Sequence, residues 1–183
     1  MKKLFWQMVV SLDGFMEAPD GSFDWHVGGE QFDRYVRDML GSIDAILLGR
    51  VTYEGFASYW PSSSDAEATK MNTLPKVVFS KSLQGADWNN SRIVRDAGVD
   101  EIARLKRDGG KDLALLASAD LASTLLPLGL IDEVRVLVMP VVLGGGRPMF
   151  KGPERMALEL LETQVFETGV VCMNYRPVTQ TRA

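Results

Sequence analysis

The chain has 183 residues, of which 46% are hydrophobic and 24% are charged, as in an ordinary globular protein with a substantial core. Its net charge of −4 argues against a dedicated nucleic-acid-binding protein, which usually presents a basic face. The single cysteine excludes an internal disulfide, no cysteine–histidine cluster has metal-ligand spacing, and no apolar run could span a membrane. We therefore expect one cytoplasmic domain over residues 1–183, with no metal, nucleic-acid or membrane partner.

Apolar runs and helical stretches alternate along the chain, which is typical of an α/β fold. Strands are expected over Leu4–Val10, Ala45–Leu48, Lys76–Phe79, Ile93–Val94, Leu113–Leu116, Glu133–Val142, Leu158–Phe166 and Val170–Val178. Helices are expected over Glu30–Leu40, Asp100–Arg107 and Leu121–Leu128, with a further helix beginning near Thr52. Runs of four apolar residues predict a largely parallel sheet that is covered on both faces. The last two strands are expected to pair in antiparallel fashion through a turn at residues 167–169.

The segment Ser11–Gly29 is predicted to be a long loop, and loops of this length are usually functional in compact domains. Trp25 could pack over a substrate or simply cap the core. His26, the single histidine, is interpreted as a polar loop residue rather than a catalytic acid. Cys172 stands in an apolar run and is interpreted as a core residue rather than a nucleophile.

Three of the expected strands end in residues that suit an anion. After the first of them, Gly49 lets a ligand approach the backbone and Arg50 offers a guanidinium for phosphate. Thr52 adds a hydroxyl near the start of the next helix. The other two segments are Ser80, Lys81 and Ser82, and Ala117, Ser118 and Ala119. Taken singly, the three segments could be a helix start, a solvated turn and a helix N-cap, but a sheet would bring them together around one ligand with several phosphates.

The ordinary nucleotide motifs are absent from the sequence. No phosphate-binding loop of the G-x-x-x-x-G-K-[ST] type occurs. Gly144-Gly145-Gly146 is followed by Arg147-Pro148-Met149, so the last glycine of a dinucleotide fingerprint is missing. A nucleotide site in this chain would therefore not be of the ordinary Rossmann type.

Several longer motifs carry a resemblance to a known family. They are Ser11-Leu12-Asp13-Gly14, Asp20-Gly21-Ser22-Phe23-Asp24-Trp25, Leu48-Gly49-Arg50-Val51-Thr52-Tyr53-Glu54, Leu130-Ile131-Asp132-Glu133 and Pro140-Val141-Val142-Leu143-Gly144-Gly145-Gly146-Arg147-Pro148-Met149-Phe150. In this order they resemble the dihydrofolate-reductase-like superfamily, in particular stand-alone relatives of the C-terminal reductase domain of the bifunctional riboflavin-biosynthesis enzyme. The resemblance implies a three-layer α/β sandwich with a mixed, mostly parallel central sheet, an NADPH site, and hydride transfer to a heterocyclic substrate.

The resemblance assigns the three strand ends to one cofactor. Gly49, Arg50 and Thr52 match the family's cofactor-phosphate turn, and the segment Ser80–Ser82 matches the one that holds the adenosine 2′-phosphate. A dianionic phosphate favours a lysine between two hydroxyls, whereas the bare ribose of NAD would be met by a carboxylate. The segment Ala117–Ala119 falls at the turn against the pyrophosphate, with Ala117 in place of the family's usual glycine.

On the substrate side, the resemblance points to a carboxylate on the first helix. Asp33 corresponds in position to the group that binds and helps to protonate a pterin, and Glu30 competes with it because residues three apart share a helix face. Either residue could instead be a solvated helix carboxylate. Asp13 and Trp25 lie in the region that covers the nicotinamide, and Arg147 either reaches a substrate phosphate or is solvated in a sharp turn.

The leading functional hypothesis is an NADPH-dependent reductase of a pyrimidine- or pteridine-like molecule. The nearest family activity is the 5-amino-6-(5-phosphoribosylamino)uracil reductase of riboflavin biosynthesis. Dihydrofolate reduction is one alternative, and a non-catalytic nucleotide-binding protein that retains the fold is another. Family resemblance also suggests a homodimer, with the two C-terminal strands as its interface.

Overall fold

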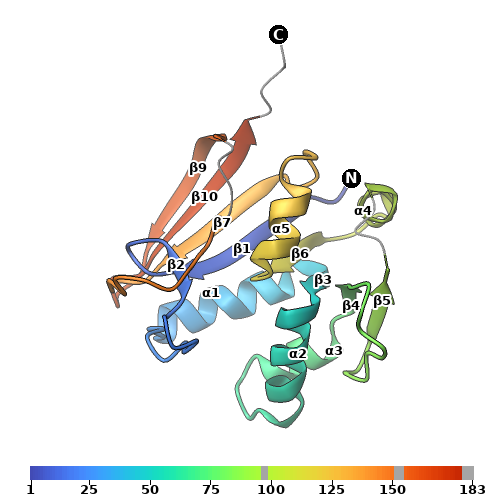
Figure 1. The fold of residues 1–183 in the computed structure, drawn as a ribbon, viewed down its shortest axis with the longest axis horizontal. Helices are drawn as coiled ribbons and strands as arrows, with labels where there is room; N and C mark the ends of the chain where they lie inside the picture. Colours follow the sequence, from blue (N-terminus) through green and yellow to red (C-terminus); the bar gives the residue numbers. More distant parts are fainter. Residues whose placement is uncertain (96–98, 151–154, 179–183) are drawn as a thin grey trace.

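An eight-stranded mixed sheet forms the centre of the fold (Figure 1). The computed structural model describes residues 1–95, 99–150 and 155–178. The strand order is β5-β4-β3-β6-β1-β7-β10-β9. The parallel part consists of β1 (Leu4–Val10), β3 (Ile43–Gly49), β4 (Lys76–Phe79), β5 (Ser91–Val94), β6 (Asp112–Leu116) and β7 (Glu133–Val138). At the far edge, β10 (Val171–Val178) runs antiparallel to both β7 and β9 (Ala157–Val165), so the sheet is mixed but mostly parallel, as predicted.

Helices cover both faces of this sheet. The helical segments are α1 (Glu30–Gly41), α2 (Arg50–Tyr59), the 3-10 turn η1 (Trp60–Ser62), α3 (Ala68–Thr73), α4 (Val99–Arg107) and α5 (Ala119–Leu125). On one face, Ile102 of α4 and Leu125 of α5 pack in a core cluster with Trp6 of β1. On the other face, Leu40 of α1 packs in a second cluster with Ile46 of β3, and residues of α2 and α3 join it. The predicted three-layer α/β arrangement is therefore confirmed.

The strands predicted from continuous apolar runs are the central ones, because only these are covered on both sides. In β3, Ile46, Leu47 and Leu48 are completely buried although their side chains alternate between the two faces. Cys172 on β10 is also buried, and burial raises the pKa of its thiol. A thiol that is harder to ionise is a poorer nucleophile, so this environment agrees with the interpretation of Cys172 as a core residue.

Several boundaries differ from the sequence prediction. The expected strand Glu133–Val142 ends at Val138, because Met139 still donates a hydrogen bond to the carbonyl of Val10 but Pro140 has no N–H to continue the ladder. The expected helix Leu121–Leu128 begins two residues earlier and ends at Leu125. The loop over residues 11–29 contains a short strand, β2 (Phe15–Glu17), which pairs with β8 (Arg147–Pro148). Such a two-stranded pairing cannot be read from either segment alone.

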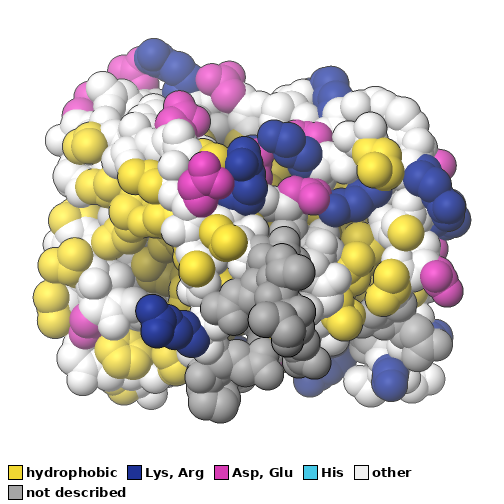
Figure 2. All heavy atoms as spheres, turned by 90° about the horizontal axis from the view of Figure 1, so that it is seen from above, with side chains coloured by type: hydrophobic (Ala, Val, Ile, Leu, Met, Phe, Trp, Pro, Cys, Tyr) yellow, Lys and Arg dark blue, Asp and Glu magenta, His cyan; other side chains and the backbone are white. Residues whose placement is uncertain are grey.

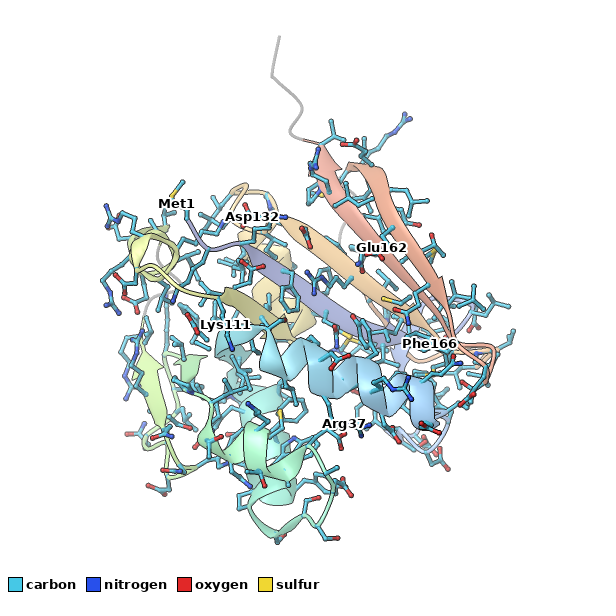
Figure 3. The ribbon with its side chains drawn as sticks, turned by 180° about the vertical axis from the view of Figure 1, so that it is seen from behind. Met1, Arg37, Lys111, Asp132, Glu162 and Phe166 are labelled. Carbon is cyan, nitrogen blue, oxygen red and sulfur yellow. The ribbon has the colours of Figure 1, made fainter. Side chains whose placement is uncertain are left out.

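The carboxyl ends of the parallel strands lie at one edge of the sheet. In register, Gly49 at the end of β3 pairs with Phe79 of β4, and Phe79 pairs with Val94 of β5. Figure 3 shows Met1, Lys111 and Asp132 at the opposite, amino edge, whereas Phe166 after β9 lies at the carboxyl edge. Open parallel sheets bind ligands at the carboxyl edge, so the candidate site is sought there. Among the described residues, no helix has the length and apolar character needed to cross a membrane.

Candidate functional site

The turn after β3 brings two of the predicted anion-binding segments into contact. Gly49 is the N-cap residue of α2, and its N–H donates to the hydroxyl of Ser118 at 3.0 Å. A methyl group added to Gly49 would lie 3.7 Å from the Cβ of Leu121 on α5. Arg50 begins α2, and Thr52 is half-buried in its first turn. The end of β3 and the start of α5 are therefore in direct contact.

The turn after β6 holds two consecutive residues in the left-handed conformation. Ala117 has φ 49° and Ser118 has φ 51°, a region that costs residues other than glycine free energy. The peptide groups of Ala117 are fixed from both sides, because its N–H donates to the carbonyl of Gln7 at 2.9 Å and its carbonyl accepts from the indole of Trp6 at 2.6 Å. Hydrogen bonds to Gln7 and Trp6 of β1 thus hold the turn in its strained conformation.

Ser118 occupies the N-cap position of α5, but its side chain does not cap that helix. Its hydroxyl instead accepts the hydrogen bond from Gly49, a residue 69 positions earlier in the chain. Ala119, the next residue, is buried at the start of α5. The hydroxyl of Ser118 therefore joins two strand ends, which a reading of Ser118 as a local N-cap could not predict.

The turn after β4 is organised by its own serine. The hydroxyl of Ser80 accepts hydrogen bonds from the N–H of Ser82 at 3.3 Å and of Leu83 at 2.9 Å. Its own hydrogen is then left to donate away from the turn. The side chains of Lys81 and Ser82 are exposed beside it. The turn offers an ammonium and two hydroxyls on a rigid backbone, which suits a phosphate.

Arg50 is paired in this structure. Its guanidinium lies 2.7 Å from the carboxylate of Glu54, one turn along α2, and both side chains are nearly half exposed. Exposed pairs of this kind contribute only about 0.3–0.5 kcal/mol to stability. A phosphate arriving at the start of α2 could therefore compete with Glu54 for Arg50.

Arg95 is a residue of this edge that the sequence reasoning missed. It follows β5, and its guanidinium donates to the backbone carbonyls of Ser80, Lys81 and Leu83 at 3.3, 3.4 and 2.6 Å. The sequence does contain a pattern that could have identified Arg95, because Ile93-Val94-Arg95 is a short apolar strand followed by a cation. Only the parallel pairing of β5 with β4 shows that this cation belongs beside Lys81.

The two candidate carboxylates lie in the first turn of α1. Glu30 forms an ion pair with Arg34 at 2.7 Å, and both side chains are well exposed. Asp33 is also exposed and lies close to Gly28. Within the residues that the structure describes, neither carboxylate contacts the three strand-end turns. Their part in proton transfer thus stays a prediction.

Asp13 ties the long loop to the segment after β7. One of its carboxylate oxygens accepts from the hydroxyl of Ser11 at 2.7 Å and from the N–H of Leu143 at 3.1 Å. The other accepts from the N–H of Gly144 at 2.8 Å. The hydrogen bond from Ser11, with those from the two amides, holds the pKa of Asp13 below its ordinary value. In this conformation Asp13 stays ionised and joins two loops.

The remaining two substrate-side candidates also have partners. Arg147 on β8 lies 2.6 Å from Asp120 at the start of α5 and 3.9 Å from Glu17 on β2. Trp25 donates its indole N–H to the carbonyl of Ser22 at 3.1 Å and packs against the core cluster that contains Phe166. Trp25 therefore packs against the core from this loop, and its expected contact with a substrate stays a prediction.

Comparison with known proteins identifies the family of this chain. The sequence model of the RibD C-terminal domain family matches residues 2–172. A Bacillus subtilis protein described as uncharacterized, YyaP, is 34% identical over 180 residues, which cover 95% of this chain and 94% of that protein. These matches confirm the resemblance inferred from the motifs.

Solved structures confirm the fold. A putative riboflavin biosynthesis protein from Shewanella superposes with a TM-score of 0.79 at 22% identity, covering 97% of this chain and 99% of that one. Dihydrofolate reductase from Enterococcus faecalis, solved in complex with NADP(H) and RAB-propyl, gives a TM-score of 0.66 at 15% identity. It covers 97% of both chains, so the sheet and its helices correspond almost throughout.

Proposed function

Because the chain belongs to the RibD C-terminal domain family, we propose that it is an NADPH-dependent reductase that transfers a hydride to a pyrimidine- or pteridine-like small molecule. The nearest reaction is reduction of 5-amino-6-(5-phosphoribosylamino)uracil. The observation that carries the proposal is the convergence of three anion-binding turns at one sheet edge, two of them joined by the hydrogen bond from Gly49 to Ser118. A ligand with several phosphates would use all three.

The residues present fit NADPH. The first turn of α2 offers backbone N–H groups, Arg50 and the hydroxyl of Thr52 to the pyrophosphate. The exposed Lys81 and the hydroxyls of Ser80 and Ser82 would hold the 2′-phosphate. The turn formed by Ala117, Ser118 and Ala119 would receive the pyrophosphate from the other side.

In the proposed reaction the protein mainly binds and orients its ligands. NADPH, when bound, supplies the hydride, so the chain needs to provide position and a proton. We assign the proton transfer to Asp33, because Glu30 is held by Arg34 whereas no partner of the Asp33 side chain is found among residues 1–95, 99–150 and 155–178. Arg147 would bind a substrate phosphate after leaving Asp120, and Asp13 and Trp25 would shape the cover of the nicotinamide from their loop.

Two alternatives have specific support. Dihydrofolate reduction is favoured by the agreement of the fold with a dihydrofolate reductase. A non-catalytic nucleotide-binding protein is favoured by Ala117, whose methyl group stands in a strained turn where a cofactor should approach closely, and by the exposure of Glu30 and Asp33. In the first alternative the cofactor is the same and the substrate is dihydrofolate. In the second the protein binds a nucleotide but catalyses no reaction.

Assembly and location belong to the same proposal. Because its first and last strands join a single sheet, we propose that the chain acts as one domain over residues 1–183. We also propose that it acts in the cytoplasm, where NADPH is available. We further propose a homodimer through the edge strand β9 and its neighbour β10. Leu160 and Val165 of β9 are 54% and 67% exposed, and such apolar side chains on an edge strand favour pairing with another chain. Figure 2 shows hydrophobic side chains gathered on the left, the side on which β9 and β10 lie in Figure 1.

Titration of NADPH and NADH, followed by quenching of tryptophan fluorescence, tests the cofactor assignment. The wild type should prefer NADPH, and Lys81→Ala should lose about tenfold or more of that preference because a charge-assisted contact to the 2′-phosphate disappears. Lys70→Ala is the matched control, since Lys70 is an exposed lysine on α3. Equal binding of both cofactors by the wild type would contradict the assignment.

A further inference from the structure

We propose that Arg95 is the second cation of the 2′-phosphate site and that it sets the preference for NADPH over NADH. This inference rests on the proposed function, because it assumes that the turn after β4 receives the adenosine end of the cofactor. It adds a residue from a different strand, β5, which ends beside that turn. The geometry of Arg95, the charge of the site and the shape of the guanidinium support the assignment in turn.

The guanidinium of Arg95 is hydrogen-bonded to the backbone of the turn. One terminal nitrogen of its guanidinium lies within hydrogen-bond distance of the carbonyls of Ser80, Lys81 and Leu83. With those carbonyls directed to Arg95, the N–H groups of Ser82 and Leu83 are directed to the hydroxyl of Ser80. The two sets of hydrogen bonds leave the turn little freedom. The side chain of Lys81 thus projects from a backbone that is organised before any ligand arrives.

The charge of the site requires a second cation. A 2′-phosphate carries nearly two negative charges near neutral pH, and Lys81 supplies one positive charge. Arg50, at the end of the neighbouring strand β3, is already paired with Glu54. Arg95 has no carboxylate partner within the residues that the structure describes. It follows β5, on the side of β4 away from β3, and it donates to the carbonyl of Lys81, so it can balance the second charge.

The shape of arginine allows both tasks at once. Its planar guanidinium has five N–H donors, and its hydrogen bonds to the turn use a single terminal nitrogen. In the described part of the chain, the Nε and the other terminal nitrogen have no acceptor. Together they form the fork that matches two oxygens of a phosphate. A lysine at this position would keep the charge, but its single nitrogen could not bind the backbone of the turn and two phosphate oxygens in the same way.

The experiment compares dissociation constants for NADPH and NADH in Arg95→Gln and Arg95→Lys. Arg95→Gln should weaken NADPH binding by about tenfold or more and leave NADH within about twofold, and Arg95→Lys should fall between it and the wild type. Arg92→Gln is the matched control, because Arg92 lies on the same strand but pairs with Glu101. The same titrations with adenosine 2′,5′-bisphosphate and 5′-AMP isolate the 2′-phosphate from the nicotinamide.

The outcomes separate this inference from the proposed function. Equal loss for both cofactors in Arg95→Gln would show that Arg95 only supports the loop, and an unchanged NADPH affinity would show that it has no part in binding. Either result overturns the role of Arg95 while the wild type still binds NADPH. A wild type that binds neither cofactor would overturn the proposed function, and the role of Arg95 with it.

Discussion

At the scale of single residues, the left-handed backbone of Ala117 strains the turn after β6. A left-handed residue other than glycine costs roughly 1–2 kcal/mol, and the hydrogen bonds to Gln7 and Trp6 hold Ala117 there. In the proposed site the same methyl group would face the cofactor, at a position where the family resemblance implies a glycine. The Cβ atom of Ala117 thus causes the backbone strain, and in the proposed site it would also limit the approach of the cofactor.

Ala117→Gly should therefore raise the free energy of unfolding by about 1 kcal/mol, after allowance for the flexibility of glycine in the unfolded chain. Urea unfolding measures the change. The control is Ala122→Gly within α5, where the backbone is helical and glycine should cost about 1 kcal/mol or more. Destabilisation by both substitutions would mean that the turn carries no strain that glycine relieves.

Substitutions of Asp33 and Glu30 are expected to have different effects on kcat. Asp33→Asn should lower kcat by about 100-fold, because a positioned general acid contributes at least this much, while the affinity for NADPH stays unchanged. Glu30→Gln should have a small effect, since Glu30 is already paired with Arg34. Steady-state kinetics over a range of pH checks both. A large loss in Glu30→Gln alone would move the proton-transfer role to Glu30.

The candidate residues were predictable to the extent that they follow apolar strands. Gly49, Lys81 and Ser118 each stand at such a strand end, and a parallel sheet necessarily gathers those ends. Their partners were not predictable, because the bond from Gly49 to Ser118 and the contacts of Arg95 depend on strand order and register. No local sequence pattern contains that information.

At the scale of elements, the short helix α3 depends on a buried cation. Lys76 at the start of β4 is completely buried, and its ammonium donates to the carbonyls of Met71 and Asn72 at 2.7 and 3.2 Å. The ammonium also lies 4.1 Å from the centre of the Trp88 ring. These contacts satisfy two of the last four carbonyls of α3 and join it to the sheet. Burial nevertheless lowers the pKa of Lys76 from 10.5 to about 8.

This lowered pKa predicts how stability depends on pH. Below about pH 8, Lys76 is protonated in both the folded and unfolded states, so it contributes no pH dependence. Between about pH 8 and 10.5 the unfolded state binds more protons, so the free energy of unfolding of the wild type should rise relative to that of Lys76→Met. Urea unfolding of both proteins across this range measures the difference. Parallel pH profiles would show that folding does not perturb Lys76.

The elements themselves were predicted well where burial is uniform and poorly where it is not. The central strand β1 was predicted with its observed ends because nearly every residue in it is buried. The strands β2 and β8 were missed because their pairing depends on Asp13, which joins the two loops, and on Gly146, where any side chain would collide with the carbonyl of Glu17. These are tertiary constraints on segments with weak intrinsic preference.

At the scale of the whole molecule, the edge strand β9 predicts assembly. Leu160 pairs with Tyr175 of β10, which packs against the core on the side of α5, so Leu160 lies on that face of the sheet. Leu160→Lys should shift the proposed homodimer toward monomer, as measured by light scattering after size-exclusion chromatography. Gln164→Lys is the control, because Gln164 pairs with Cys172 on the opposite face. A monomeric wild type would contradict the proposed dimer.

The overall architecture followed from the sequence because apolar runs and motifs extend over nearly the whole chain, and the family match covers residues 2–172. The reaction did not follow to the same degree. Two of the turns that would hold NADPH are joined by the hydrogen bond from Gly49 to Ser118, whereas the candidate carboxylates Glu30 and Asp33 are exposed at the start of α1. The same edge of the sheet thus defines the cofactor more closely than the substrate.

The most direct test of the proposed function is hydride transfer itself. NADPH carrying two deuterium atoms at C4 of its nicotinamide should be oxidised by the wild type in the presence of a pyrimidine or pterin acceptor, and mass spectrometry should find one deuterium in the reduced product. Asp33→Asn should slow this transfer without preventing NADPH binding. Binding of NADPH with no transfer to any acceptor of either class would contradict the account and leave a nucleotide-binding protein that retains the fold.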